Sequence, residues 1–359
     1  MKSCLDELLT ALNRISCGIS VVVMPDFFQD RLITLKQAPP EFAAAIENVA
    51  NRKGGSIDNI SQTDLRGGNA VNTASALAAL GVKVTPIVCT NKLGLQQIDF
   101  HLKPLGIDTS HVKVLAKASL TTALELEGEE GKVNVMLRDL GSLADFGPAD
   151  LSNGDCDLIR NADYVCVFNW AGTRNHCTEL AQSVFRMVKT GGKGKTYFDT
   201  ADPTPNRGKI PELVKNVLRT RLVDVLSLNE NEAVTYATQL KEDFRAERGK
   251  LRFDELAMES ARYLAGQLSA RIDLHTTSFS ATFTGKSEVV VPTFKVKALR
   301  ATGAGDAWNA GNIFADGNGL SDEYRLILGN AVAACYLSSP DGAHPTREKL
   351  ARFLKKQST

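Results

Sequence analysis

The sequence lacks a dominant charge, a paired-cysteine motif and a long hydrophobic run. Its 42 basic and 41 acidic residues give a net charge of +1, so no overall field attracts nucleic acid or an anionic membrane. The seven cysteines are scattered and form no C-x-x-C pair, which argues against a disulfide framework and a zinc ribbon. The run ISVVVM is too short to cross a bilayer. We expect a soluble, cytoplasmic protein with no nucleic-acid or membrane partner.

The second half of the chain alternates strands and helices. ADYVCVFN is typical of a buried strand, and TELAQSVFRMVKTGG is typical of an amphipathic helix that ends at Gly191 and Gly192. Similar pairs follow to about residue 277, and then a hairpin over residues 280–296 and three helices are expected. Continuous apolar strands with helical connections predict a mostly parallel sheet enclosed by helices, which is an α/β fold.

The first part of the chain is richer in strands. Residues 21–35 are expected to form a strand, residues 39–55 a helix, and residues 120–139 two strands around a turn. Strand-rich segments therefore gather at about 27–66 and 118–140. They predict a small sheet at the edge of the larger α/β body.

The stretch TGAGD covers Thr302 to Asp306; it follows a strand-like stretch and precedes a helical pattern. Glycine lets the backbone approach a ligand closely, and the free N–H groups at a helix start favour an anion. Asp306 would lie at or near the N-cap. Taken alone, the motif leaves two interpretations open: an anion site with a base attached, or a helix that Asp306 merely caps.

A second glycine motif, GGNAVN, begins at Gly67 and Gly68 and includes Asn72. The glycines indicate close approach of a ligand or of a neighbouring strand, and Asn72 can offer a donor and an acceptor to hydroxyl groups. The motif is not G-x-G-x-x-G, which argues against a dinucleotide-dependent oxidoreductase.

The stretch NENE follows a predicted strand and contains Asn229 and Glu232. Ligands bind at the carboxyl ends of strands in α/β sheets, and residues three apart share a helix face. An amide and a carboxylate there suit hydrated Mg²⁺. The alternative is an ordinary helix start.

Acidic residues also mark DFFQD, from Asp26 to Asp30. In one continuous strand the two acids would point to the same face and could accept hydrogen bonds from sugar hydroxyls. The alternative is that both face water. Asp30 is the stronger candidate because it lies deeper in the apolar run.

The stretch FNWAGTRN, residues 168–175, ends another predicted strand. Arg174 could contact a phosphate there, or Trp170 a ring. A packed tryptophan and a surface arginine are the favoured interpretation.

These motifs, in this order, resemble the ribokinase-like carbohydrate kinase family, also called the PfkB family. TGAGDAWNAG is the most specific match, and GGNAVNTASALAALG, NENEA and GNAVAACYLSSPDGAHP support it. The match runs from about residue 18 to 355. It implies one domain over 1–359, a Rossmann-like three-layer α/β sandwich with a small β-sheet lid from about 27–66 and 118–140.

The resemblance implies transfer of the γ-phosphate of ATP, with Mg²⁺, to a hydroxyl of a sugar or nucleoside. Its implied site residues are Asp306 as base; Gly303, Ala304 and Gly305 as anion hole; Asp30, Gly67, Gly68, Asn72 and, more weakly, Asp26 at the substrate; Asn229, Thr302 and Asn330 at the nucleotide; and Glu232 with Asn229 at the metal.

Two positions depart from the family pattern. Arg300 stands where relatives often carry an acid that helps a monovalent-cation site, so potassium activation does not follow. Asn69 stands where some members carry a basic residue. A nucleoside kinase, an ADP-dependent donor, a non-catalytic sugar sensor and a homodimer through the lid all stay open from sequence.

Overall fold

The body of the protein is built on one large, mostly parallel sheet. The computed structural model describes residues 2–15, 18–128, 131–300 and 302–358. The sheet has the order β14-β13-β12-β11-β10-β9-β1-β4, and only β13 runs antiparallel to its neighbours, β12 and β14. The strands are β1 (Ser20–Met24), β4 (Lys83–Pro86), β9 (Tyr164–Phe168), β10 (Lys195–Asp199), β11 (Val225–Leu228), β12 (Arg271–His275), β13 (Phe279–Phe283) and β14 (Glu288–Pro292).

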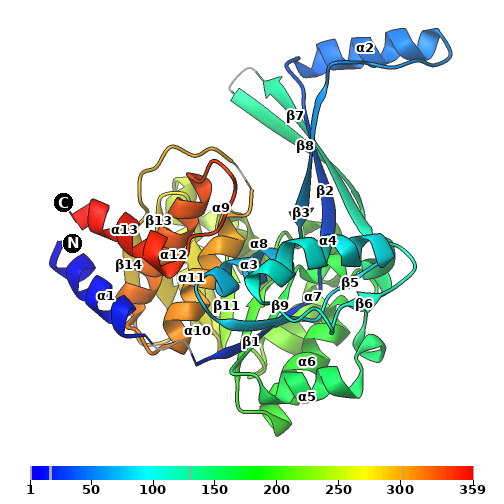
Figure 1. Cartoon of the computed structure of the whole chain (residues 1–359). Helices are drawn as coiled ribbons and strands as arrows, with labels where there is room; N and C mark the ends of the chain where they lie inside the picture. The colour runs from blue at the N-terminus through cyan, green and yellow to red at the C-terminus, as the bar shows by residue number, and fades with distance from the viewer. Residues whose placement is uncertain (1, 16–17, 129–130, 301, 359) are drawn as a thin grey trace.

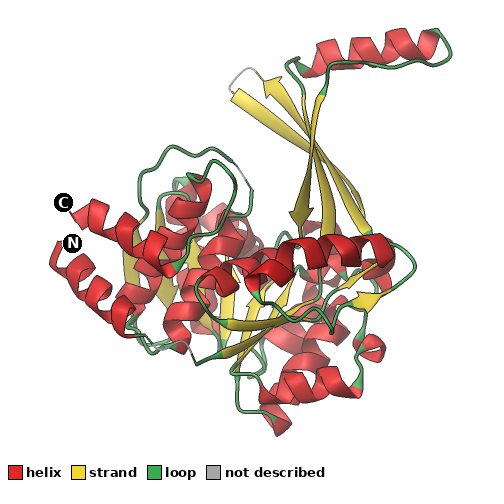
Figure 2. Cartoon of the chain, viewed as in Figure 1, coloured by secondary structure: helices red, strands yellow, loops and turns green. Residues whose placement is uncertain are grey.

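Helices cover both faces of this sheet (Figure 2). One face packs against α1 (Lys2–Arg14), α3 (Asn69–Ala79), α4 (Lys92–Leu102), α11 (Ala304–Gly317), α12 (Asp322–Leu337) and α13 (Arg347–Ser358). The other packs against α5 (Asn153–Asn161), α6 (Cys177–Gly191), α7 (Ile210–Leu213), α8 (Glu230–Leu240), α9 (Phe244–Glu247) and α10 (Phe253–Gln267). β1 shows why both faces are apolar: Val21 and Val23 enter one core, whereas Val22 and Met24 enter the other. The α/β sandwich predicted from the sequence is confirmed.

A four-stranded sheet rises from the body as an arm (Figure 1). Its order is β3-β2-β7-β8, formed by β2 (Phe28–Thr34), β3 (Ser61–Gly67), β7 (Ser119–Gly128) and β8 (Gly131–Asp139). We call this sheet the lid. Helix α2 (Pro39–Asn51) sits at its far end and buries no residue. A pair of two-residue strands, β5 (Cys89–Thr90) and β6 (Lys113–Val114), lies near its base.

The lid exposes apolar side chains on its strands. These are Leu65, Leu120, Val133, Val135, Met136 and Leu137. Such a surface is typical of an interaction site, and the lid-mediated homodimer stays a prediction. Within the described ranges, no helix is long and apolar enough to span a membrane. The six described cysteines are free thiols, and Cys17 lies outside the described residues.

The structure corrects two local predictions. The strand predicted over residues 21–35 is two strands in different sheets, β1 and β2, so Asp26 lies in their connection and does not share a strand face with Asp30. The glycine loop TGAGD does not follow a strand directly, because β14 ends at Pro292 and an irregular segment leads to the loop.

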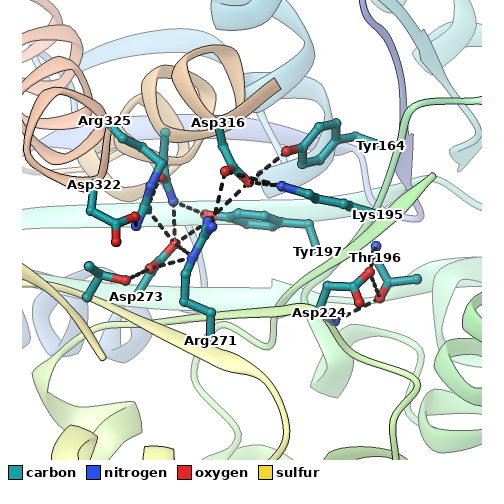
Figure 3. A network of polar contacts seen from close by, with 12 residues as sticks. Tyr164, Lys195, Thr196, Tyr197, Asp224, Arg271, Asp273, Asp316, Asp322 and Arg325 are labelled. Carbon is teal, nitrogen blue, oxygen red and sulfur yellow. Dashed lines mark hydrogen bonds and ion pairs between the residues drawn. The ribbon is translucent and has the colours of Figure 1, made fainter. Parts of the chain in front are cut away.

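A buried polar network holds α11 on the amino ends of the strands (Figure 3). Arg325 pairs with Asp273 at 2.8 Å, and both side chains are inaccessible to solvent. Asp316, near the end of α11, pairs with Arg271 at 3.1 Å and accepts a hydrogen bond from the Tyr164 hydroxyl at 2.6 Å. Buried ion pairs contribute more to a unique arrangement than to net stability in several systems. The opposite end of α11 carries the glycine loop.

Candidate active site

The glycine loop leaves the start of α11 open to an anion. Gly303 adopts a left-handed conformation with φ of 82°, and a Cβ there would lie 2.6 Å from the Tyr336 hydroxyl oxygen. Glycine is therefore required at this position. No side chain caps the helix, so its first N–H groups, which include those of Ala304 and Gly305, are free of capping side chains. Together with the helix dipole they favour a negatively charged group.

Asp306 lies in the first turn of α11 and turns its carboxylate toward α3. It is 6% exposed. Its Oδ1 accepts a hydrogen bond from the Asn69 amide at 2.8 Å, and its Oδ2 accepts one from the Asn72 amide at 3.0 Å. The two glycine motifs, more than two hundred residues apart in sequence, thus form one site. Asp306 is held by side chains and is not the cap of its helix.

Burial raises the pKa of Asp306 to about 8, and the charges of Asp199 and Asp26 add to this rise. The hydrogen bonds from Asn72 and Asn69 act in the opposite direction. A carboxyl group with a pKa near the working pH can accept a proton effectively from a bound hydroxyl.

Asp26 positions this pair of asparagines. Its fully buried carboxylate accepts hydrogen bonds from the backbone of Asn69 (3.0 Å) and Ala70 (2.9 Å), and from the side chain of Asn169 (2.9 Å). It therefore does for α3 what an N-cap side chain does, from a different segment of the chain. These three donors show that the Asp26 carboxylate orients the start of α3; its contact with the substrate stays a prediction.

The close approach of Asp26 depends on Gly68. This residue has φ of 97°, and a Cβ there would lie 2.7 Å from the Asp26 carbonyl oxygen and 2.8 Å from the Phe27 Cα. The backbone of Gly68 is therefore packed against the backbone that carries Asp26.

Asp30 enters the site from the lid strand β2. Its carboxylate lies directly over Gly67, where any Cβ would clash with it. Its Oδ1 is buried without a hydrogen-bond partner among the described residues. Burial raises its pKa to about 6, against the opposing effects of a hydrogen bond with Thr121 and the charge of Arg138. A buried acceptor without a partner calls for a ligand donor, such as a hydroxyl group.

Asn229 and Glu232 form a capping box at the start of α8. The Asn229 backbone and amide nitrogens donate to the two carboxylate oxygens of Glu232, at 2.9 and 2.7 Å. This is the ordinary helix start that the sequence left open. Glu232 is also buried, and burial together with the charge of Asp199 raises its pKa well above the usual value.

The described residues contain no cluster of three metal-ligating side chains. Mg²⁺ does not need one, because it commonly binds one or two carboxylates, the phosphates of its nucleotide and several waters. The oxygen donors of Asn229 and Glu232, beside Asp199, are of the kind that Mg²⁺ prefers. They fit such a hydrated ion.

The remaining predicted residues have ordinary surroundings. Thr302 is exposed. Asn330 is buried, accepting from the Trp308 indole at 3.0 Å and donating to the Pro292 carbonyl at 3.1 Å, so its adenine contact gains no support. Trp170 is buried and Arg174 is exposed, as the favoured interpretation of that stretch had it.

Sequence reasoning missed Asp199, which lies between the two halves of the site. It is buried at the carboxyl end of β10 and accepts a hydrogen bond from Asn309 of α11 at 2.6 Å. Its charge raises the pKa of both Asp306 and Glu232. Its place at the end of a parallel strand was the available signal.

Arg300 fastens the segment before the glycine loop to the C-terminal loop. Its guanidinium donates to the Ser339 carbonyl and lies 5.1 Å from the centre of the Tyr336 ring. It also packs against Gly342, where a Cβ would clash with it. The position where relatives often carry an acid thus holds a fixed positive charge.

Comparison with known proteins identifies the family of this chain. The family model described as pfkB family carbohydrate kinase matches residues 43–349. The chain is 23% identical to a ribokinase of Haemophilus influenzae over 80% of this chain and 87% of that protein. It is 26% identical to a 5-dehydro-2-deoxygluconokinase of Clostridium perfringens over 81% and 84%. The structure of an Arabidopsis thaliana ribokinase complexed with ribose and ATP superposes with a TM-score of 0.69 at 20% identity, covering 94% of this chain and 99% of that one.

Proposed function

Because the chain belongs to the pfkB family of carbohydrate kinases, we propose that it transfers the γ-phosphate of ATP to a hydroxyl of a sugar or sugar-like substrate, with Asp306 as the base. One observation carries this proposal. A buried carboxylate with a raised pKa lies in the first turn of a helix whose leading N–H groups are open to an anion.

Each of these residues has a separate role in the proposed reaction. Asp30 accepts hydrogen bonds from hydroxyls of the acceptor, and Asp306 takes the proton of the hydroxyl that attacks. A bond forms from that oxygen to the γ-phosphorus, and the bond to the β-phosphate oxygen breaks to release ADP. The N–H groups of Ala304 and Gly305 stabilise the charge on the transferred group.

Asn229 and Glu232 would hold a hydrated Mg²⁺ beside Asp199. The ion, when bound, would neutralise charge on the phosphates. Glu232 must then exchange at least one of its hydrogen bonds with Asn229 for water or metal.

The pH dependence of turnover tests the role of Asp306. The base must be deprotonated, so kcat/KM should rise with pH and level off above about pH 8. Asn72 lowers this pKa, so Asn72→Leu should move the rise to higher pH. Initial rates across the pH range, with and without this substitution, provide the measurement. A profile that is flat through this range in the wild type would contradict the assignment.

The cation dependence of turnover tests the role of Arg300. Because its guanidinium is a permanent positive charge bound to the Ser339 carbonyl, replacing K⁺ with Na⁺ or choline at constant ionic strength should change kcat by less than about twofold. Arg300→Ala should lower kcat, because it releases the glycine loop from the C-terminal loop. Strong activation of the wild type by K⁺ would contradict this expectation.

The acceptor is found by direct assay. A panel of sugars, sugar phosphates, sugar acids, inositols and nucleosides is incubated with ATP or ADP and Mg²⁺, and nucleotide conversion and phosphorylated product are both measured. Transfer to a sugar supports the proposal, and transfer to a nucleoside identifies the nucleoside kinase. Ligand binding without transfer from either nucleotide would identify a sugar sensor and overturn it.

A further inference from the structure

Arg66, the last residue of β3 before the glycine pair, is a half-buried cation without a counter-ion. Its side chain forms no ion pair or hydrogen bond with any described residue. The nearby Arg31 on the neighbouring strand, by contrast, is exposed and paired with Asp64 at 2.6 Å. Burying a charge is costly unless a group of opposite charge accompanies it.

The strand register shows which way Arg66 points. Arg66 pairs with Gln29, whereas Asp30 pairs with Leu65. Successive side chains of a strand point to opposite faces, so Arg66 and Asp30 project from opposite sides of the lid. Arg66 is therefore turned away from the carboxylate that we assign to the acceptor hydroxyls.

Arg66 is instead close to the glycine loop and the base. Asn69, which donates to Asp306 at 2.8 Å, follows Arg66 by three residues, a span of at most about 10 Å. Burial lowers the pKa of the Arg66 guanidinium, and the nearby side chains of Tyr336 and Asp306 act in the opposite direction. Tyr336 in turn lies against Gly303, where a Cβ would approach its hydroxyl to 2.6 Å.

Neither neighbour neutralises Arg66. A tyrosine hydroxyl is uncharged near pH 7, and burial raises the pKa of Asp306 to about 8, so that its carboxyl is largely protonated there. The other titratable groups near Arg66 are His101 and His344; burial lowers the pKa of both, and the charge of Arg66 lowers it further. Arg300 also acts on His344. Arg66 and Arg300 thus make this region positive overall.

We propose that Arg66 binds the transferred phosphoryl group from the lid and stabilises its charge while the group moves from ADP to the acceptor oxygen. This inference rests on the proposed function. Arg66 donates hydrogen bonds to phosphoryl oxygens, and the attacking proton still goes to Asp306. A guanidinium matches the geometry of phosphoryl oxygens and stays protonated throughout. The lid thereby contributes a residue to the catalytic site.

The experiment compares Arg66→Gln and Arg66→Lys in the full-length protein, with Arg31→Gln as the matched control on the same face of the lid. Binding of the ATP analogue AMP-PNP and of ADP, each with Mg²⁺, is measured by titration calorimetry. Arg66→Gln should raise the Kd for AMP-PNP by about tenfold and the Kd for ADP by less than about twofold. The Kd of Arg66→Lys for AMP-PNP should lie between those of the wild type and Arg66→Gln, and Arg31→Gln should change neither Kd.

Steady-state kinetics and thermal melting distinguish binding of the transferred phosphoryl group by Arg66 from acceptor binding and from a purely structural role. With an acceptor that the panel identifies, Arg66→Gln should lower kcat by about 10²–10³-fold with little change in the acceptor KM. The variant should melt no lower than the wild type, because it removes an uncompensated cation. Equal weakening of both nucleotides, no weakening of either, or a raised acceptor KM with unchanged kcat would overturn the inference. A wild type that binds neither nucleotide would overturn the proposed function with it.

Discussion

Asp306→Asn is expected to lower kcat by roughly 10²–10⁴-fold, because a positioned base contributes about that much to proton transfer. The amide keeps the shape of the carboxyl but cannot take a proton from the acceptor. Asn69 and Asn72 both donate to Asp306, so the variant retains one oxygen acceptor for them.

The fold should survive this substitution. Burial raises the pKa of Asp306 to about 8, so the native protein near pH 7 already carries a largely neutral side chain there. A group whose pKa is raised on folding is stabilising in its protonated form, and that stability is lost as pH rises toward the folded value. The wild type therefore loses stability between the unfolded pKa of an aspartate, about 4, and about pH 8, whereas the amide does not titrate. The Tm of Asp306→Asn relative to the wild type should rise across that range and level off above about pH 8. Near-normal turnover, or an unfolded variant at pH 7, would contradict the assignment.

Gly303→Ala is expected to lower kcat by about 10²–10³-fold, the loss typical of a damaged oxyanion site. The new Cβ would lie 2.6 Å from the Tyr336 hydroxyl oxygen. The alanine would also have to adopt the left-handed φ of 82° that Gly303 has, which is strained for a residue with a side chain. The first turn of α11 must then shift, and its N–H groups shift with it. Steady-state kinetics with the identified acceptor measure the loss.

Gly305→Ala is the matched comparison within the same loop. Gly305 has no left-handed conformation, and its Cβ would have one near neighbour, the His275 Cε1 at 3.4 Å. The loss should therefore be much smaller than for Gly303→Ala. Equal losses would indicate that any side chain on the loop blocks the ligand, and the backbone conformation of Gly303 would not be the cause.

The parts of the site that could be predicted are those with local chemical meaning. TGAGD and GGNAVN each predict close backbone approach and free N–H groups. Their order along the chain resembles that of a kinase family, and this resemblance predicts that the two motifs belong to one site. The structure brings them together through the hydrogen bonds from Asn69 and Asn72 to Asp306. That contact depends on packing between distant helices, which no local pattern encodes.

The predictions that were wrong or missing concern where strands end and which way side chains point. Asp26 and Asp30 were expected on the same face of one strand, with Asp30 the stronger candidate. The chain instead leaves one sheet and enters another between them, and Asp26 turns inward to α3. Asp199 and Arg66 have no motif of their own. Their significance comes from burial beside Asp306, which only the folded chain reveals.

The most direct test of the proposed kinase activity follows the γ-phosphate of ATP. ATP labelled at its γ-phosphate is incubated with the acceptor panel and either the wild type or Asp306→Asn, in parallel near pH 8. The label should appear in a phosphate ester of an acceptor alcohol with the wild type and be reduced by roughly 10²–10⁴-fold with the variant. Label that stays in ATP or appears only as free phosphate with every acceptor, or equal transfer by both proteins, would contradict the central claim.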